Sequence, residues 1–187
     1  DATSLFTNIP LAPTLDFLKR KLPSCNVALP LPIDCLIDLI NLASRDSFFS
    51  FDASYYQQTF GFSMGNPLSP VLANLFLEHV ESELLPTFSG VSPKLWLRYV
   101  DDVLAFVDDT FVLPDFLNFI NSLYPSLHFT FEWESNGTIP FLDVSIIRNM
   151  SSLVFKVFRK PTHSHSYLHF FSCHPTNIKI SVAQGLF

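Results

Sequence analysis

Residues 95–107, LWLRYVDDVLAFV, consist of two almost wholly apolar runs that meet at Asp101-Asp102. Short apolar runs of this length predict two buried strands, residues 95–100 and 103–107. A plain β-turn more often carries Asn-Gly or Asp-Gly than two adjacent acids. Adjacent carboxylates repel each other unless a cation lies between them, and clustered carboxylates suit Mg²⁺. The pattern therefore indicates a hairpin that presents a metal site, with a solvated acidic turn as the alternative.

Two other acidic positions carry less information. The pair Asp108-Asp109 follows the end of the second apolar run and precedes Thr110, so we interpret it as a solvated turn. Asp1, which is followed by Ser4-Leu5-Phe6, is uninformative by itself and gains meaning only together with other motifs.

Helices and strands are expected to alternate along the rest of the chain. Thr14 is a candidate N-cap, Ile33, Leu36, Ile37 and Ile40 have helical spacing, and Asn66-Pro67 suits the start of the longest helix, whose residues Leu72, Leu75 and Phe76 belong to the core. Expected helices cover residues 14–22, 33–40, 66–86 and 116–123, with another from Asn177; expected strands cover residues 1–6, 47–51, 54–58, 129–134, 139–147 and 153–158, with hairpin turns at Asp52-Ala53 and Asn136-Gly137. This order predicts an α+β fold with an antiparallel sheet packed on helices.

Composition limits the function classes without choosing one. The chain has 187 residues, 48% of them hydrophobic, which is enough for one domain with a sizeable core. Its net charge of −6 counts against a nucleic-acid-binding domain but does not exclude one. Three widely spaced cysteines form no CxxC pair, so a reducing intracellular compartment is expected, in the nucleus or the cytoplasm.

Targeting signals and membrane spans are not expected. The most apolar stretch, residues 33–43, is interrupted by Asp34, Asp38 and Asn41, so no membrane association is predicted. The sequence has no initiator Met and no signal peptide, so Asp1 is expected to be an internal residue of a longer open reading frame.

Five stretches, taken together, resemble the motifs of reverse transcriptases. They are DATSLFTNIP (residues 1–10), GFSMGNPLSP followed by ANLF (residues 61–70 and 73–76), LRYVDD (residues 97–102), PFLDV (residues 140–144) and FRKPTH (residues 158–163). SLFTNIP, the Met before Gly65 and RKPTH look most like Penelope-like retroelements. The resemblance covers essentially the whole chain, and Asn66 stands where the family usually has Ser.

The resemblance implies a polymerase palm with part of the fingers and the start of the thumb. Residues 1–187 would be a palm fragment, in which residues 11–60 belong partly to the fingers and residues 175–187 begin the thumb or connection. The rest of the fingers and thumb, and a possible endonuclease, would lie elsewhere in the full-length protein. The implied partners are an RNA template, a DNA primer and deoxynucleoside triphosphates.

The resemblance also implies roles for individual residues. Asp1 and Asp101 would hold two Mg²⁺ ions about 3.5–4 Å apart, with Mn²⁺ as a substitute, and Asp102 would support them. The other implied sites are substrate contacts at Leu5, Phe6, Met64, Gly65 and Asn66, and nucleic-acid contacts at Tyr99, Arg159 and Lys160. Phe6 would be a steric gate against a ribose 2′ hydroxyl, with core packing as its alternative. Arg159 and Lys160 would contact primer phosphates; the alternative for both is a solvated strand end.

Three other hypotheses compete with this one. A decayed or repurposed copy could bind an RNA–DNA duplex without polymerising, but intact Asp1, Asp101 and Asp102 favour the enzyme. A nucleotide cyclase would not need the motifs at Gly65-Asn66-Pro67 and Arg159-Lys160-Pro161. A zinc site at His163, His165, His169, Cys173 and His174 is disfavoured because the spacing matches no standard closed site.

Overall fold

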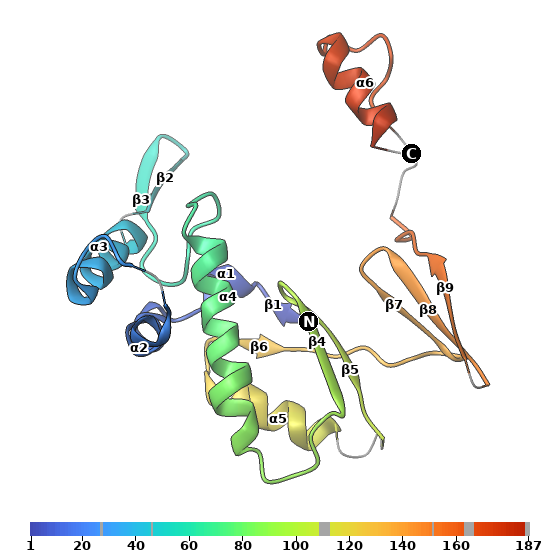
Figure 1. Cartoon of the computed structure of the whole chain (residues 1–187). Coiled ribbons are helices and arrows are strands. Elements are labelled where there is room, and N and C mark those ends of the chain that lie inside the picture. Colours follow the sequence, from blue (N-terminus) through green and yellow to red (C-terminus); the bar gives the residue numbers. More distant parts are fainter. Residues whose placement is uncertain (27, 46, 109–112, 151, 163–166, 186–187) are drawn as a thin grey trace. The chain divides into compact units, whose positions relative to one another are not determined.

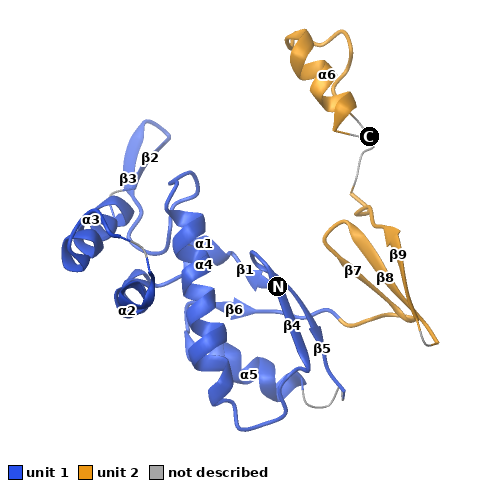
Figure 2. Cartoon of the chain, in the orientation of Figure 1, with its two compact units in different colours: residues 1–132 blue, residues 133–187 orange. Residues whose placement is uncertain are grey.

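The computed structural model describes residues 1–26, 28–45, 47–108, 113–150, 152–162 and 167–185. These residues form a mixture of helices and small antiparallel sheets, which is an α+β fold (Figure 1). The chain divides into two compact units, residues 1–132 and residues 133–187 (Figure 2). Within the described part of the chain, every helix is too short or too polar to serve as a membrane span.

The first unit contains most of the helices. Its elements are β1 (Ala2–Thr3), α1 (Leu5–Asn8), α2 (Leu11–Lys21), η1 (Leu22–Ser24), α3 (Ile33–Arg45), β2 (Phe48–Phe51), β3 (Ser54–Gln57), α4 (Ser69–His79), η2 (Val80–Leu84), η3 (Leu85–Thr87), β4 (Leu95–Tyr99), β5 (Asp102–Phe106), α5 (Leu113–Leu123) and β6 (His128–Phe129). Its described strands pair as β1–β6, β2–β3 and β4–β5, all antiparallel. The single antiparallel sheet that we expected is thus replaced by short two-stranded pairs.

The core of this unit lies around α4. Its buried apolar side chains come from β1, α1, α2, α4, α5, β6 and the segments that join them; they include Ala2, Leu5, Ile9, Leu18, Phe62, Leu72, Phe76, Phe116, Ile120 and Phe129. Phe76 is fully buried, and its ring meets Tyr124 edge to face at 4.9 Å. Core membership of Leu72 and Phe76 is therefore confirmed, whereas Leu75 is only half-buried.

Two helices begin at residues other than those expected. α2 begins at Leu11, so Thr14 is not its cap: the Thr14 hydroxyl lies inside the helix and donates to the Pro10 carbonyl at 2.8 Å. α4 begins at Ser69, with Leu68 as N-cap and Pro70 in its first turn. Asn66 instead accepts the Leu68 amide at 2.9 Å in a turn before the helix. Proline is favoured in a first helical turn, and here Pro70 rather than Pro67 takes that place.

The second unit is a three-stranded sheet followed by a helix. Its elements are β7 (Thr138–Phe141), β8 (Val144–Asn149), β9 (Ser152–Val157) and α6 (Thr176–Gln184). The hairpin expected between residues 129–134 and 139–147 is wrong. Asn136-Gly137 closes only an isolated bridge between Ser135 and Thr138, and the real hairpin turn is at Leu142-Asp143, where Leu142 has a φ of 53°. A Leu-Asp turn carries no strong sequence signal, so this division could not be predicted.

Candidate active site

The β4–β5 hairpin presents the acidic pair, with the turn one residue earlier than expected. Tyr99 pairs with Asp102, so Asp102 opens β5 and the two turn residues are Val100 and Asp101. Val100 has a φ of 57°, a left-handed conformation that costs an L-residue about 1–2 kcal/mol. A β-branched residue rarely adopts it, and such strain persists only where neighbouring contacts enforce it. Both aspartates are half-buried at this turn.

The first strand brings Asp1 to the same turn. The Ala2 amide donates to the Asp101 carbonyl at 3.1 Å. On its other side, the Asp1 carbonyl accepts the Thr130 amide at 2.9 Å, and the Asp1 amino group donates to the Thr130 carbonyl at 2.9 Å. The segment at Asp1-Ala2 is therefore held between the residues that follow β6 and the turn that carries Asp101.

The electrostatic surroundings of Asp1 agree with this placement. Burial lowers the pKa of the Asp1 amino group, and the negative charges of Asp102, Asp101 and Glu132 offset part of this shift. Glu132 was not predicted as a site residue, and nothing in its local sequence distinguishes it from a solvated acid.

The donor chemistry at this turn suits a divalent cation, although the side chains do not yet form a complete ligand set. Asp1, Asp101 and Asp102 supply carboxylate oxygens, which are the hard ligands that Mg²⁺ prefers. Among the described residues, no group of three or more His, Cys, Asp or Glu side chains is arranged so that it could hold a metal ion. What the structure shows is that backbone contacts bring Asp1 and the turn at Asp101-Asp102 together.

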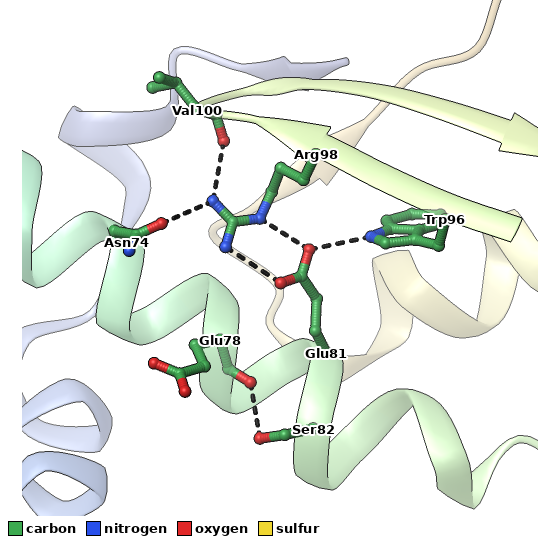
Figure 3. Close-up of polar contacts among 7 residues, drawn as sticks. All are labelled: Asn74, Glu78, Glu81, Ser82, Trp96, Arg98 and Val100. Atoms are coloured by element: carbon green, nitrogen blue, oxygen red, sulfur yellow. Dashed lines mark hydrogen bonds and ion pairs between the residues drawn. The ribbon is translucent and has the colours of Figure 1, made fainter.

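An arginine on β4 connects this turn to the central helix (Figure 3). Arg98 donates through Nε and Nη2 to the two carboxylate oxygens of Glu81, at 2.6 and 3.0 Å. Its Nη1 donates to Asn74 Oδ1 at 2.9 Å and to the Val100 carbonyl at 3.4 Å. Glu81 Oε1 also accepts the Trp96 indole N–H at 2.9 Å. The sequence motif assigns no role to Arg98, although an arginine within an apolar strand needs a charged partner when it is buried.

Phe6 and Leu5 follow β1 on the short helix α1. The Leu5 side chain is buried in the core, and a substrate contact at this residue stays a prediction. Phe6 is half-buried against that core, and its carbonyl accepts the Phe62 amide at 2.6 Å. Next to this bond, Gly61 has a φ of +73°, and a Cβ there would lie 2.2 Å from the Thr7 carbonyl oxygen. The Phe6 backbone is thus fixed by a close approach that only glycine permits.

The loop before α4 has anchored ends and an exposed tip. Ser69 Oγ donates to the Ser63 carbonyl at 2.7 Å, and Asn66 Nδ2 donates to the Ala43 carbonyl at the end of α3, at 2.8 Å. Between them, Met64 is 75% exposed, and Gly65 has a φ of +102° with open space around the position of a Cβ. Asn66 is therefore engaged with α3, whereas Met64 and Gly65 are available to a ligand.

The predicted nucleic-acid contacts fall in both units. Tyr99 is exposed at the end of β4 in the first unit. Arg159 and Lys160 are exposed just after β9 in the second unit. His163 and His165, which belong to the disfavoured zinc site, lie outside the described residues. Asp109, of the pair Asp108-Asp109 that we interpret as a solvated turn, lies outside them too.

Comparison with protein-family models, with curated proteins and with solved structures found no match for this chain.

Proposed function

We propose that this chain is the palm of a reverse transcriptase, an RNA-directed DNA polymerase that adds deoxynucleotides to a primer 3′ hydroxyl. The bond from the Ala2 amide to the Asp101 carbonyl carries the proposal. It joins the two acidic motifs that such an enzyme must bring together, although they lie far apart in the sequence. Two unrelated solvated acids would have no reason to share this contact.

Asp1, Asp101 and Asp102 would hold the metal ions. When bound, two Mg²⁺ ions, or Mn²⁺ in their place, activate the attacking hydroxyl and neutralise charge on the transferred phosphate. The work of this chain is positioning: the β4–β5 turn presents two carboxylates, and the pairing of residues 1–3 with β6 and this turn presents the third.

Other residues would select and hold the substrates. Phe6 lies on a backbone fixed by Phe62 and Gly61, which suits a rigid gate against a ribose 2′ hydroxyl. The exposed Met64-Gly65 tip would contact the nucleotide, and Tyr99 would contact the primer end. Arg159 and Lys160 would contact primer phosphates through their charge. Residues 11–60 would form part of the fingers, and residues 175–187 the start of the thumb.

Asp101→Asn tests the proposal in the complete open reading frame, with a labelled primer on an RNA template. Removing one carboxylate should lower the extension rate by more than about 10²–10³, since a single electrostatic contact in a transition state is worth that much. Template–primer binding should change little. Asp108→Asn is the matched control, because exposed Asp108 pairs only with Lys94, at 2.7 Å, in the described part of the chain. Full activity in both variants would refute the assignment of Asp101.

A second function, duplex binding without polymerisation, would rest on the exposed basic residues Arg159 and Lys160, which can contact phosphates without a metal. A protein that only binds an RNA–DNA duplex would show no Mg²⁺-dependent extension in the wild type, and Asp101→Asn and Asp108→Asn would then behave alike.

A further inference from the structure

We infer that Arg98 is a positioning residue: it fixes the Val100-Asp101 turn against the segment of α4 and η2, and thereby sets the direction of the two carboxylates. The inference rests on the proposed function for its catalytic consequence, but its structural part stands on contacts within the first unit. The group of side chains is called here the Arg98 clamp and consists of Arg98, Glu81, Trp96 and Asn74.

The geometry of the clamp shows what it holds. Its fixed end is Glu81 in η2, which receives two donors from Arg98 and one from Trp96. Its other end is Arg98 Nη1, which reaches both Asn74 of α4 and the carbonyl of Val100 (Figure 3). The guanidinium is planar, so two bonds to Glu81 fix the direction of the remaining N–H groups. The Val100 carbonyl is therefore held in place relative to α4 and η2, and not by the hairpin alone.

The conformation at Val100 explains why the turn needs an external contact. With a φ of 57°, Val100 holds a backbone conformation that β-branched residues avoid. Such a turn keeps this conformation only where surrounding groups enforce it. The carbonyl of Val100 belongs to the peptide group that leads into Asp101, whose own carbonyl accepts the Ala2 amide. Rotation of that peptide would therefore move the Asp101 carboxylate and loosen Asp1 together.

Burial distinguishes this ion pair from the pair that Arg20 forms with Glu83. The Arg98 side chain is 13% exposed, against 56% for Arg20, which forms a similar two-oxygen pair with Glu83. Buried ion pairs are weak contributors to stability, because desolvation offsets their attraction, and the best-attested reason to retain one is structural specificity. Arg20 also bonds the η2 segment, through Glu83. None of its described contacts leads to the β4–β5 turn. It is thus the matched control for Arg98.

Arg98→Lys, Glu81→Gln and Arg20→Lys test the inference in the complete protein. Lysine keeps the charge but cannot reach Glu81, Asn74 and Val100 from one planar group. The first measurement is amide hydrogen exchange at Ala2, whose N–H donates to Asp101. Exchange should become several-fold faster in Arg98→Lys and Glu81→Gln and stay unchanged in Arg20→Lys, when all are measured well below their melting temperatures.

The second measurement is primer extension against Mg²⁺ concentration. In Arg98→Lys the Mg²⁺ concentration that gives half-maximal rate should rise and kcat should fall, by up to about 10²-fold if the carboxylate moves by an ångström. A role in stability alone would lower the melting temperature and the active fraction but leave the Mg²⁺ dependence as in the wild type. Arg20→Lys should leave the Mg²⁺ dependence unchanged.

The outcomes separate the inference from the proposed function. Unchanged Ala2 exchange in folded Arg98→Lys and Glu81→Gln would overturn the inference, whatever the enzyme does. Faster exchange in a protein whose wild type does not extend primers would overturn the proposed function and leave the clamp in place. Faster exchange with an unchanged Mg²⁺ dependence would overturn the catalytic consequence of the clamp.

Discussion

The two units of the chain differ in charge and in packing. Residues 1–132 carry fifteen acidic and six basic side chains, whereas residues 133–187 carry two acidic and five basic side chains. The first unit buries a core around α4, while every residue of β9 in the second unit is exposed. The overall charge of −6 averages over this division and describes neither unit by itself. An acidic unit suits metal ions, and a basic unit suits a phosphate backbone.

Paired truncations test the difference in packing and should give the largest effect. Phe76→Ala should lower the free energy of unfolding of the first unit by about 3–5 kcal/mol, the usual cost of emptying a buried phenylalanine site. Phe155→Ala, at a side chain that is 62% exposed on β9, should change stability by less than about 0.5 kcal/mol. Urea unfolding can be followed unit by unit, because Trp96 lies in the first unit and Trp133 in the second.

The difference in packing between the two units would be refuted if Phe155→Ala lowered the free energy of unfolding as much as Phe76→Ala. That result would mean that other residues cover Phe155 in the folded protein, so that β9 is not exposed in solution.

The sequence predicted local structure better than it predicted the contacts that build the site. Residues 95–107 read as two strands because both apolar runs are short and flanked by acids, and β4 and β5 confirm this to within one or two residues. The position of the turn was missed by one residue, since a valine with positive φ carries no sequence signal. The pairing of Arg98 with Glu81 was also missed. It joins a strand to a helix segment through side chains alone, and many acids in the chain could have been the partner.

Phe6 is a half-buried residue of α1 that packs against the core, so its truncation tests a side chain of the first unit that is proposed to have a second role. If Phe6 is the proposed gate, Phe6→Ala in the complete protein should raise incorporation of ribonucleotides relative to deoxynucleotides, because a smaller side chain leaves room for the 2′ hydroxyl. Its loss of stability should be smaller than that of Phe76→Ala, because Phe6 is only half-buried. The measurement is the ratio of kcat/KM values for matched ribo- and deoxynucleoside triphosphates.

Phe88→Ala is the control for this experiment. Phe88 is another half-buried phenylalanine packed on the core, and its ring contacts Phe116 and Phe119 rather than α1. It should lose stability without changing the choice of sugar. If Phe6→Ala behaves in the same way, Phe6 is a packing residue and the gate must be sought elsewhere.

The smallest expected effect tests the difference in charge. Lys160→Ala in the second unit should weaken binding of a fluorescent RNA–DNA hybrid only modestly, because one phosphate contact among several is lost. Its clearer sign is the salt dependence: the slope of log affinity against log salt should fall in magnitude by about 0.7–0.9, the value for one neutralised phosphate.

Lys94→Ala in the first unit is the control, since Lys94 is equally a surface lysine but pairs with Asp108 at 2.7 Å. The salt slope of Lys94→Ala should match that of the wild type. If Lys94 contacts no phosphate, its loss does not change the number of counterions that the hybrid releases on binding. Equal changes of slope in both variants would show that the duplex contacts both units, and the division of the chain into a metal-binding acidic unit and a phosphate-binding basic unit would then be wrong.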